Sequence, residues 1–235
     1  MLCKIADLIV EVPETEDLYR RCKDYIWSSE ESADIIIRTD LFHPEHWPGY
    51  AKDMMFYMES GSIFYANLLY YNGLRLHASA IEVDGKAYLF SGPSGMGKST
   101  HTRLWRQEIS TNAQVFNDDK PAIRFVDDVW YAYGTPWCGK DAINQNKKVC
   151  LAGICFLKQA AHNKIRLLNK QEAMHQVIDQ TYHNFMKMDK LDIMLTLVDK
   201  LVREIPVFEL ENRPEPEAAQ LSYETMSRKA KEMGL

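Results

Sequence analysis

The segment that most constrains this chain is rich in glycine and reads Ser91-Gly92-Pro93-Ser94-Gly95-Met96-Gly97-Lys98-Ser99-Thr100. Residues 92–99 match the pattern G-x-x-x-x-G-K-[ST]. In that pattern, N–H groups of the loop and of the following helix surround phosphates, the lysine reaches the outer phosphates, and the hydroxyl helps to hold Mg²⁺. The apolar run 87–90 precedes the segment as a strand should, and 100–107 can continue as a helix. We therefore expect residues 92–100 to bind a nucleoside triphosphate; the alternative is a loop that only resembles such a site.

Composition bounds the class of protein. The 235 residues, of which 46% are hydrophobic and 26% charged, suffice for one large or two small domains with a real core. The net charge is -5 and the basic residues are scattered, which argues against a nucleic-acid partner. No apolar run approaches the roughly 18 residues of a membrane span, and the N-terminus does not resemble a signal peptide. Five cysteines without a C-x-x-C pair suit reduced thiols. We expect a cytoplasmic protein that does not bind membranes.

Apolar periodicity alternates along the chain between strand-like and helix-like stretches, which predicts an α/β fold. Residues 1–40 suggest strand, helix and strand, and 63–71 a helix that closes at Asn72-Gly73. Further on, we expect strands at 149–157, 164–168 and 206–210, and helices at 170–182, at 190–204 and after Pro214. No repeat or flexible linker divides the chain. We expect residues 1–60 to form an N-terminal β/α extension packed on a core of residues 61–235.

A hairpin is predicted just before the glycine-rich segment. The β-like stretches 76–83 and 86–90 flank Asp84-Gly85, a strong two-residue turn signal. With that turn, Ile81 faces Tyr88, Ser79 faces Phe90, and His77 falls opposite Gly92. A histidine on a strand is ordinarily structural, but this register places His77 at the mouth of the phosphate loop, so we regard it as a candidate site residue.

Two aspartates, Asp118 and Asp119, follow the β-like stretch 113–117. Phosphoryl transfer to a hydroxyl needs a carboxylate that holds Mg²⁺ and an acceptor for the hydroxyl proton, and adjacent aspartates at a strand end can divide these tasks. A solvated turn is the alternative for this pair. A second pair, Asp127-Asp128, lies between two β-like stretches and predicts a hairpin tip.

The stretch Tyr133-Gly134-Thr135-Pro136-Trp137-Cys138-Gly139-Lys140 is dense in turn formers. It could close over nucleotide or acceptor, with Lys140 offsetting phosphate charge. A packed tryptophan and an exposed lysine would produce the same sequence, so both interpretations stay open.

Three of these features, in this order, resemble the HPr kinase/phosphorylase family: Leu76-His77-Ala78-Ser79-Ala80, the loop 92–99, and Asp118-Asp119. The resemblance is carried by residues 74–126 and leaves out the first sixty. It implies a P-loop kinase core akin to phosphoenolpyruvate carboxykinase, with a mixed β-sheet flanked by helices. It also implies that His77 lies near the phosphates, that Lys98 and Ser99 contact nucleotide and Mg²⁺, that Asp118 activates the acceptor, and that Asp119 lies nearer the metal.

The expected function is therefore that of an HPr-kinase-like phosphotransferase that depends on ATP and Mg²⁺. It moves the γ-phosphoryl group to a hydroxyl of a protein, peptide or small molecule. In this hypothesis Asp118, Lys98 and His77 are catalytic, residues 92–100 and Lys140 bind nucleotide, and Ser99 and Asp119 hold the metal. A homo-oligomer is one option for its assembly. The alternatives are a nucleotide-binding regulator or scaffold without turnover and, less favoured, carboxykinase-like chemistry on a small acid.

Overall fold

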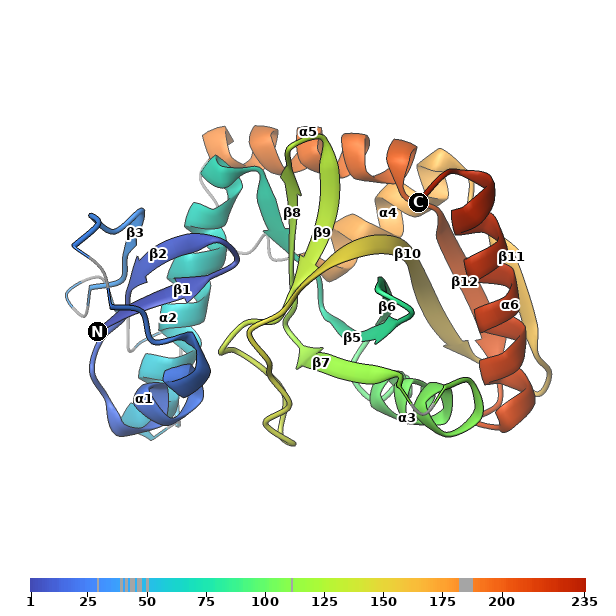
Figure 1. Cartoon of the computed structure of the whole chain (residues 1–235), viewed down its shortest axis with the longest axis horizontal. Coiled ribbons are helices and arrows are strands. Elements are labelled where there is room, and N and C mark those ends of the chain that lie inside the picture. Colours follow the sequence, from blue (N-terminus) through green and yellow to red (C-terminus); the bar gives the residue numbers. More distant parts are fainter. Residues whose placement is uncertain are drawn as a thin grey trace.

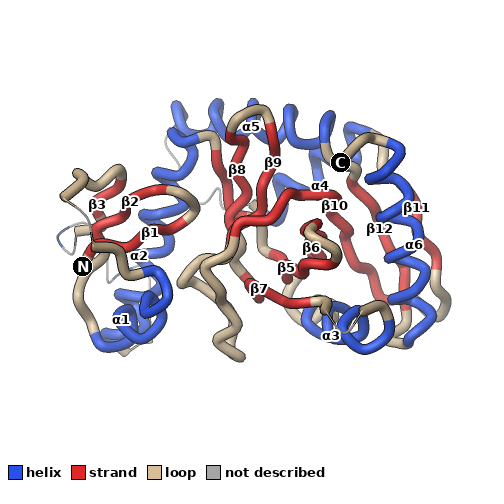
Figure 2. The backbone as a smooth tube through the Cα atoms, in the orientation of Figure 1, coloured by secondary structure: helices blue, strands red, loops and turns tan. Residues whose placement is uncertain are grey.

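The computed structural model describes residues 1–28, 30–38, 40, 42, 45, 48–49, 51–110, 112–181 and 188–235. It has a mixed α/β fold in which a curled sheet carries helices on its faces, with a smaller β/α unit beside it (Figure 1, Figure 2). This confirms the expected class of a mixed sheet flanked by helices. Among the described helices, none has the length and apolar character needed to span a membrane.

The main sheet has nine strands in the order β4-β8-β9-β10-β6-β5-β7, with β12 beside β10 and β11 beside β12. Its strands are β4 (Gly73–Arg75), β5 (Ala78–Val83), β6 (Lys86–Ser91), β7 (Gln114–Asp119), β8 (Ala122–Val126), β9 (Val129–Tyr133), β10 (Lys148–Gln159), β11 (Lys164–Leu167) and β12 (Val207–Asn212). Strand β10 is parallel to β6 and β12, and the other pairs are antiparallel. Because β10 pairs with β9 over its first residues and with β12 over its last, it joins the two halves of the sheet.

Alternation along β6 shows how two layers of helix cover the sheet. Ala87 and Leu89 join a cluster with α4 (Lys170–Gln180) and α5 (Met188–Glu204), whereas Tyr88 and Phe90 join one with α3 (Lys98–Glu108) and α6 (Pro216–Glu232). Successive strand residues point to opposite faces, so both faces of β6 are buried. The helix expected at 170–182 ends at Gln180 in the structure, and Tyr182 lies outside the described residues.

The N-terminal unit consists of a three-stranded sheet and two helices. Its elements are β1 (Leu2–Ile5), β2 (Leu8–Glu11), α1 (Glu16–Cys22), β3 (Ile35–Ile36) and α2 (Lys52–Leu68). The Asp7 carboxylate accepts hydrogen bonds from Tyr133 (2.8 Å) and Lys148 (2.7 Å) of the main sheet, and Arg124 donates to the carbonyl of Ala6. The expected boundary after residue 60 falls inside α2, which is continuous and packs on β1, β2 and α1.

Both predicted hairpins are present. In the first, Ile81 faces Tyr88 and Ser79 faces Phe90, and the turn residues Asp84 and Gly85 have φ values of 52° and 74°. Positive φ at both central positions is the type I′ geometry that matches the twist of the strands. The second hairpin joins β8 to β9 through Asp127-Asp128. The strand expected at 113–117 is longer, and β7 includes Asp118 and Asp119 themselves.

A long connection from residue 134 to residue 147 joins β9 to β10 and is held by a buried tryptophan. Trp137 stacks on Phe64 of α2, with ring centroids 4.8 Å apart, and its indole N–H donates to Ser60 (3.1 Å). A Cβ placed on Gly61 would lie 2.9 Å from Cδ1 of Trp137, so the contact requires a residue without a side chain. Trp137 is therefore packed, while a role for Lys140 beside the phosphates stays a prediction.

The variant Gly61→Ala tests this contact. Alanine favours helix by about 1 kcal/mol over glycine, but the clash with Trp137 should reverse the sign and destabilise the protein by about 1–3 kcal/mol. Urea unfolding measures the difference, with Ser62→Ala on the same helix as the control, expected to change stability by less than about 0.5 kcal/mol. A Gly61→Ala protein at least as stable as wild type would show that the packing of Trp137 does not depend on Gly61.

A buried polar group lies between α3 and α6. His101 Nε2 is 2.9 Å from the Ser222 hydroxyl, which also accepts from the indole N–H of Trp105 (2.8 Å) and donates to the carbonyl of Ala219 (2.9 Å). Because the serine proton is committed, His101 must donate through Nε2. Its Nδ1 has no partner within the described ranges, and burial lowers the pKa of His101 to about 4.

Stability should therefore fall as the solution is acidified. The pKa of His101 is depressed in the folded state, so the unfolded chain binds the proton more readily, and stability present above the ordinary pKa of 6.5 is lost as pH falls toward about 4. We expect a loss of about 2 kcal/mol between pH 7 and pH 5. The variant His101→Gln, which keeps an N–H donor but does not titrate, should lack most of this slope in urea unfolding. Equal slopes in both proteins would contradict the assignment.

Candidate active site

The glycine-rich loop connects β6 to α3 through three glycines in conformations that other residues rarely adopt. The φ values are 143° at Gly92, 81° at Gly95 and 98° at Gly97. Gly97 occupies the N-cap of α3 without a side-chain hydrogen bond, whereas α4 begins with a capping box between Asn169 and Glu172. The first N–H groups of α3 are thus left for a ligand, and the positive end of the helix dipole favours an anion there.

Lys98 begins α3 and folds back along the loop. Its Nζ donates to the carbonyl oxygens of Gly92 (2.9 Å) and Pro93 (3.2 Å). Burial lowers the pKa of Lys98, and the neighbouring Asp119 and Asp118 oppose that shift. The amine therefore lies next to the loop, where it can bind a negatively charged ligand.

Ser99, the next residue, faces the first of the paired aspartates. Its hydroxyl lies 3.1 and 3.0 Å from the two carboxylate oxygens of Asp118. The backbone of Asp118 is fixed by the 134–147 connection, because its N–H donates to Ile143 (3.1 Å) and its carbonyl accepts from Gly139 (2.6 Å). The carboxylate and hydroxyl together present oxygen atoms of the kind that Mg²⁺ prefers.

Asp119 points to a different set of partners. His77 Nε2 lies 3.0 Å from Oδ1 of Asp119, and Lys120 Nζ lies 2.8 Å from Oδ2. Burial disfavours the ionised carboxylate, but the His77 hydrogen bond and the Lys120 charge outweigh it and hold the pKa of Asp119 well below its usual range. On its other side His77 Nδ1 contacts Gln180 of α4 (3.1 Å). Asp119 also has a φ of 99°, so its backbone is strained where its carboxylate is held.

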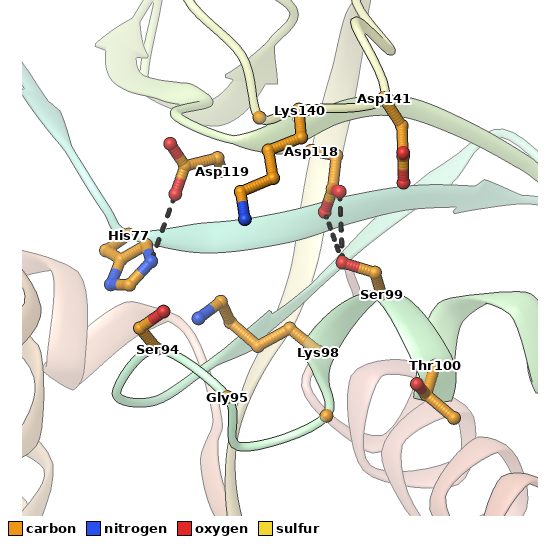
Figure 3. A pocket seen from close by; sticks show the side chains of 12 residues that line it. His77, Ser94, Gly95, Lys98, Ser99, Thr100, Asp118, Asp119, Lys140 and Asp141 are labelled. Atoms are coloured by element: carbon orange, nitrogen blue, oxygen red, sulfur yellow. Dashed lines mark hydrogen bonds and ion pairs between the residues drawn. The ribbon is translucent and has the colours of Figure 1, made fainter.

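These groups line one cavity of about 540 Å³ (Figure 3). Lys140 and Asp141 come from the 134–147 connection. They extend into the cavity from the side opposite the glycine-rich loop. The cavity is lined by His77, Ser94, Gly95, Gly97, Lys98, Ser99, Thr100, Asp118, Asp119, Gly139, Lys140 and Asp141. Of the residues expected in the site, Gly92, Pro93 and Met96 belong to the loop but do not line the cavity.

The structure does not bring together the two residues that were expected to hold the metal. Ser99 and Asp119 were expected to act together, but the structure brings Ser99 to Asp118 and gives Asp119 to His77. Residue spacing could not assign separate roles to the two aspartates. Which carboxylate faces Ser99 and which faces His77 depends on the twist of β7. Sequence reasoning also missed Lys120, Asp141 and Gln180. Lys120 and Asp141 each directly follow an expected site residue, Asp119 and Lys140, whereas Gln180 lies far from them in the chain.

A solved HPr(Ser) kinase/phosphatase from Coxiella burnetii matches with 12% sequence identity and a TM-score of 0.36, over 67% of this chain and 90% of that chain. The comparison with curated proteins gave no match.

The model of a protein family gives a broader match. It is described as SynChlorMet cassette protein ScmC and matches residues 50–213, which include α2, the glycine-rich loop, both aspartates and the 134–147 connection. Since the match covers more than two-thirds of the chain, the protein belongs to the ScmC family of SynChlorMet cassette proteins.

Proposed function

We propose that this protein is a kinase that transfers the γ-phosphoryl group of ATP to a hydroxyl, with Mg²⁺ as the metal. The observation that carries the proposal is the separation of two adjacent carboxylates across one cavity, Asp118 toward Ser99 of the glycine-rich loop and Asp119 toward His77. A site that only binds nucleotide needs no second, separately oriented carboxylate, whereas a phosphotransferase uses one for metal and one for the acceptor.

The phosphates would lie against the N-terminus of α3. The uncapped N–H groups after Gly97 supply hydrogen-bond donors, and Lys98 supplies a positive charge that can leave the loop carbonyls for a phosphate oxygen. Lys140 approaches from the opposite wall and can offset charge on the transferred group (Figure 3). The backbone N–H donors stand in place before reaction, which is what electrostatic stabilisation requires.

Ser99 and Asp118 are the pair best arranged to hold Mg²⁺. Bound there, the metal would neutralise charge on the β- and γ-phosphates. No group of three histidine, cysteine, aspartate or glutamate side chains in the described part of the chain forms a metal cage. That agrees with the usual behaviour of Mg²⁺ in kinases, which takes one or two protein oxygens and completes its shell with phosphate and water.

Asp119 and His77 would then orient the acceptor. The acceptor oxygen forms a bond to Pγ, the bond between Pγ and the bridging oxygen of ADP breaks, and the hydroxyl proton passes to Asp119 and on to solvent. Each carboxylate oxygen of Asp119 keeps a lone pair beyond its bonds to His77 and Lys120. Its low pKa makes it a weak base, which suffices in a loose transition state where the proton leaves late.

Replacement of the lysine tests the phosphate assignment. Lys98→Ala should reduce phosphoryl transfer by about 10²–10³-fold, the size seen when one preorganised donor is removed. Incubation with γ-labelled ATP and cell extract, followed by identification of the labelled product, measures it. Lys158→Ala, which removes an exposed lysine paired with Glu211 on the sheet, is the control and should transfer normally. Normal transfer by Lys98→Ala would exclude this loop as the phosphate site.

The two aspartates are predicted to fail in different ways. Asp118→Asn should raise the Mg²⁺ concentration needed for half-maximal transfer by about tenfold or more, because a metal ligand is lost. Asp119→Asn should leave the Mg²⁺ dependence nearly unchanged and lower the rate by about 10²–10⁴-fold. Titration of activity with Mg²⁺ in each variant distinguishes this division from the reverse one, in which Asp118 is the base.

Two results would contradict the kinase proposal and favour another function. Tight ATP binding with no labelled product across extracts and peptide acceptors would favour a nucleotide-binding regulator. ATP consumption that depends on oxaloacetate would instead favour carboxykinase-like chemistry. Labelling of a serine-containing protein, a peptide or a small molecule would support the kinase and name its acceptor.

A further inference from the structure

Helix α4 ends against the segment that carries His77. Its last residue, Gln180, accepts a hydrogen bond at its carbonyl oxygen from the backbone N–H of His77 (2.9 Å). Thr181, the next residue, forms a β-bridge with Leu76. The carbonyl of His77 in turn accepts from the hydroxyl of Ser91 (2.9 Å), the last residue of β6 before the glycine-rich loop. The backbone of His77 is therefore fixed on one side by α4 and on the other by the strand that leads into the loop.

The side chain of Gln180 reaches the same histidine. Oε1 of Gln180 lies 3.1 Å from Nδ1 of His77, and Oδ1 of Asp119 lies 3.0 Å from Nε2 on the other side of the ring. An ionised carboxylate only accepts, so Nε2 keeps its hydrogen toward Asp119. The amide of Gln180 carries both an acceptor and a donor, so it can meet Nδ1 with or without a hydrogen. The imidazole is thus held between two side chains through both of its nitrogens.

The second contact matters because the ring is partly open to solvent. The side chain of His77 is 25% exposed, and it lines the large cavity. Water therefore competes for the ring nitrogens, and a single hydrogen bond contributes only about 0.5–1.5 kcal/mol. With Asp119 as its one partner the ring would be free to turn away from the carboxylate. A bond on each side fixes both the tilt of the ring and the nitrogen that faces Asp119.

We propose that Gln180 is a positioning residue of the candidate active site, which holds the ring of His77 so that its Nε2–H faces the carboxylate of Asp119. Gln180 is not among the described residues that line the large cavity, so it acts through the histidine. This inference rests on the proposed kinase function, in which Asp119 takes the hydroxyl proton. An imidazole fixed on Oδ1 keeps that carboxylate in one orientation, with its remaining lone pairs left for the acceptor.

The mobility of the ring is measured first, without nucleotide, so that the result does not depend on turnover. Carbon-13 relaxation of the full chain, labelled at Cε1 of its histidines, gives an order parameter for each ring, and the signal missing from His77→Ala identifies His77. In the wild-type protein we expect a value near about 0.85, as for a rigid group. In Gln180→Leu, which keeps the bulk of the side chain but cannot hydrogen-bond, it should fall below about 0.6.

Two further variants separate the hydrogen bond from other effects of the substitution. Gln180→Glu keeps the length of the side chain and an acceptor oxygen, so it should retain the order of the His77 ring. Gln171→Leu makes the same change in the first turn of α4 and is the control, expected to leave the ring as in wild type. Urea unfolding verifies that each variant is folded.

Labelling of cell extract with γ-labelled ATP shows whether the position of the ring matters for the reaction. Gln180→Leu should lower the rate at saturating ATP by about 10–10²-fold, because a group is misplaced. The half-saturating ATP concentration should stay within about twofold, because the phosphate contacts are intact. Since Gln180 acts through His77, its replacement in a His77→Ala background should change the rate by less than about threefold.

Four results would overturn the positioning role. They are an unchanged order parameter in Gln180→Leu, a Gln180→Glu protein no better ordered than Gln180→Leu, a disordered ring with normal transfer, and equal fold losses with and without His77. If the wild-type protein labels no product, the kinase proposal fails, and the order parameters alone decide whether Gln180 fixes the ring.

Discussion

The site depends on the antiparallel pairing of β5 with a strand on each side. Ala78 faces Ser91, the last residue of β6, and on its other side faces Asp119, the last residue of β7. Neighbouring strands are about 4.8 Å apart, so the start of the glycine-rich loop and the paired aspartates lie about 10 Å apart at one edge of the sheet. That is the scale of a polyphosphate with its metal, and no flexible segment is needed to bring the two together.

The 134–147 connection completes the site because it is fixed both to strand β7 and to helix α2. Its backbone bonds to Phe116 and Asp118 extend the edge of β7, and Trp137 anchors it on α2 beside Phe64. Lys140 therefore projects from a segment that is fixed next to the cavity. Trp137 also lines a second cavity of about 50 Å³ together with Tyr57 and Tyr65. The N-terminal unit thus takes part in the site through α2, although it carries none of the expected residues.

Polar groups inside the fold follow a consistent pattern. At the edge of the sheet, Asp119 is partly buried, and contacts with His77 and Lys120 hold its pKa below its usual range. Between α3 and α6, His101 has a neutral hydrogen-bond partner and no charged one, so burial holds it neutral. Burial penalises charge in both places, and the difference lies in whether an opposite charge is near.

Local chemistry determined much of this protein from sequence alone. The Asp84-Gly85 turn set the hairpin register, and so placed His77 beside the glycine-rich loop, because a two-residue turn leaves only one alignment of its strands. The apolar run 87–90 predicted the strand that leads into the loop, and apolar periodicity predicted the helix at 190–204. Only the tertiary structure decided which aspartate faces Ser99, that Gln180 contacts His77, and that Trp137 packs on Gly61. These depend on strand twist and on contacts between residues far apart in the chain, for which local sequence carries no signal.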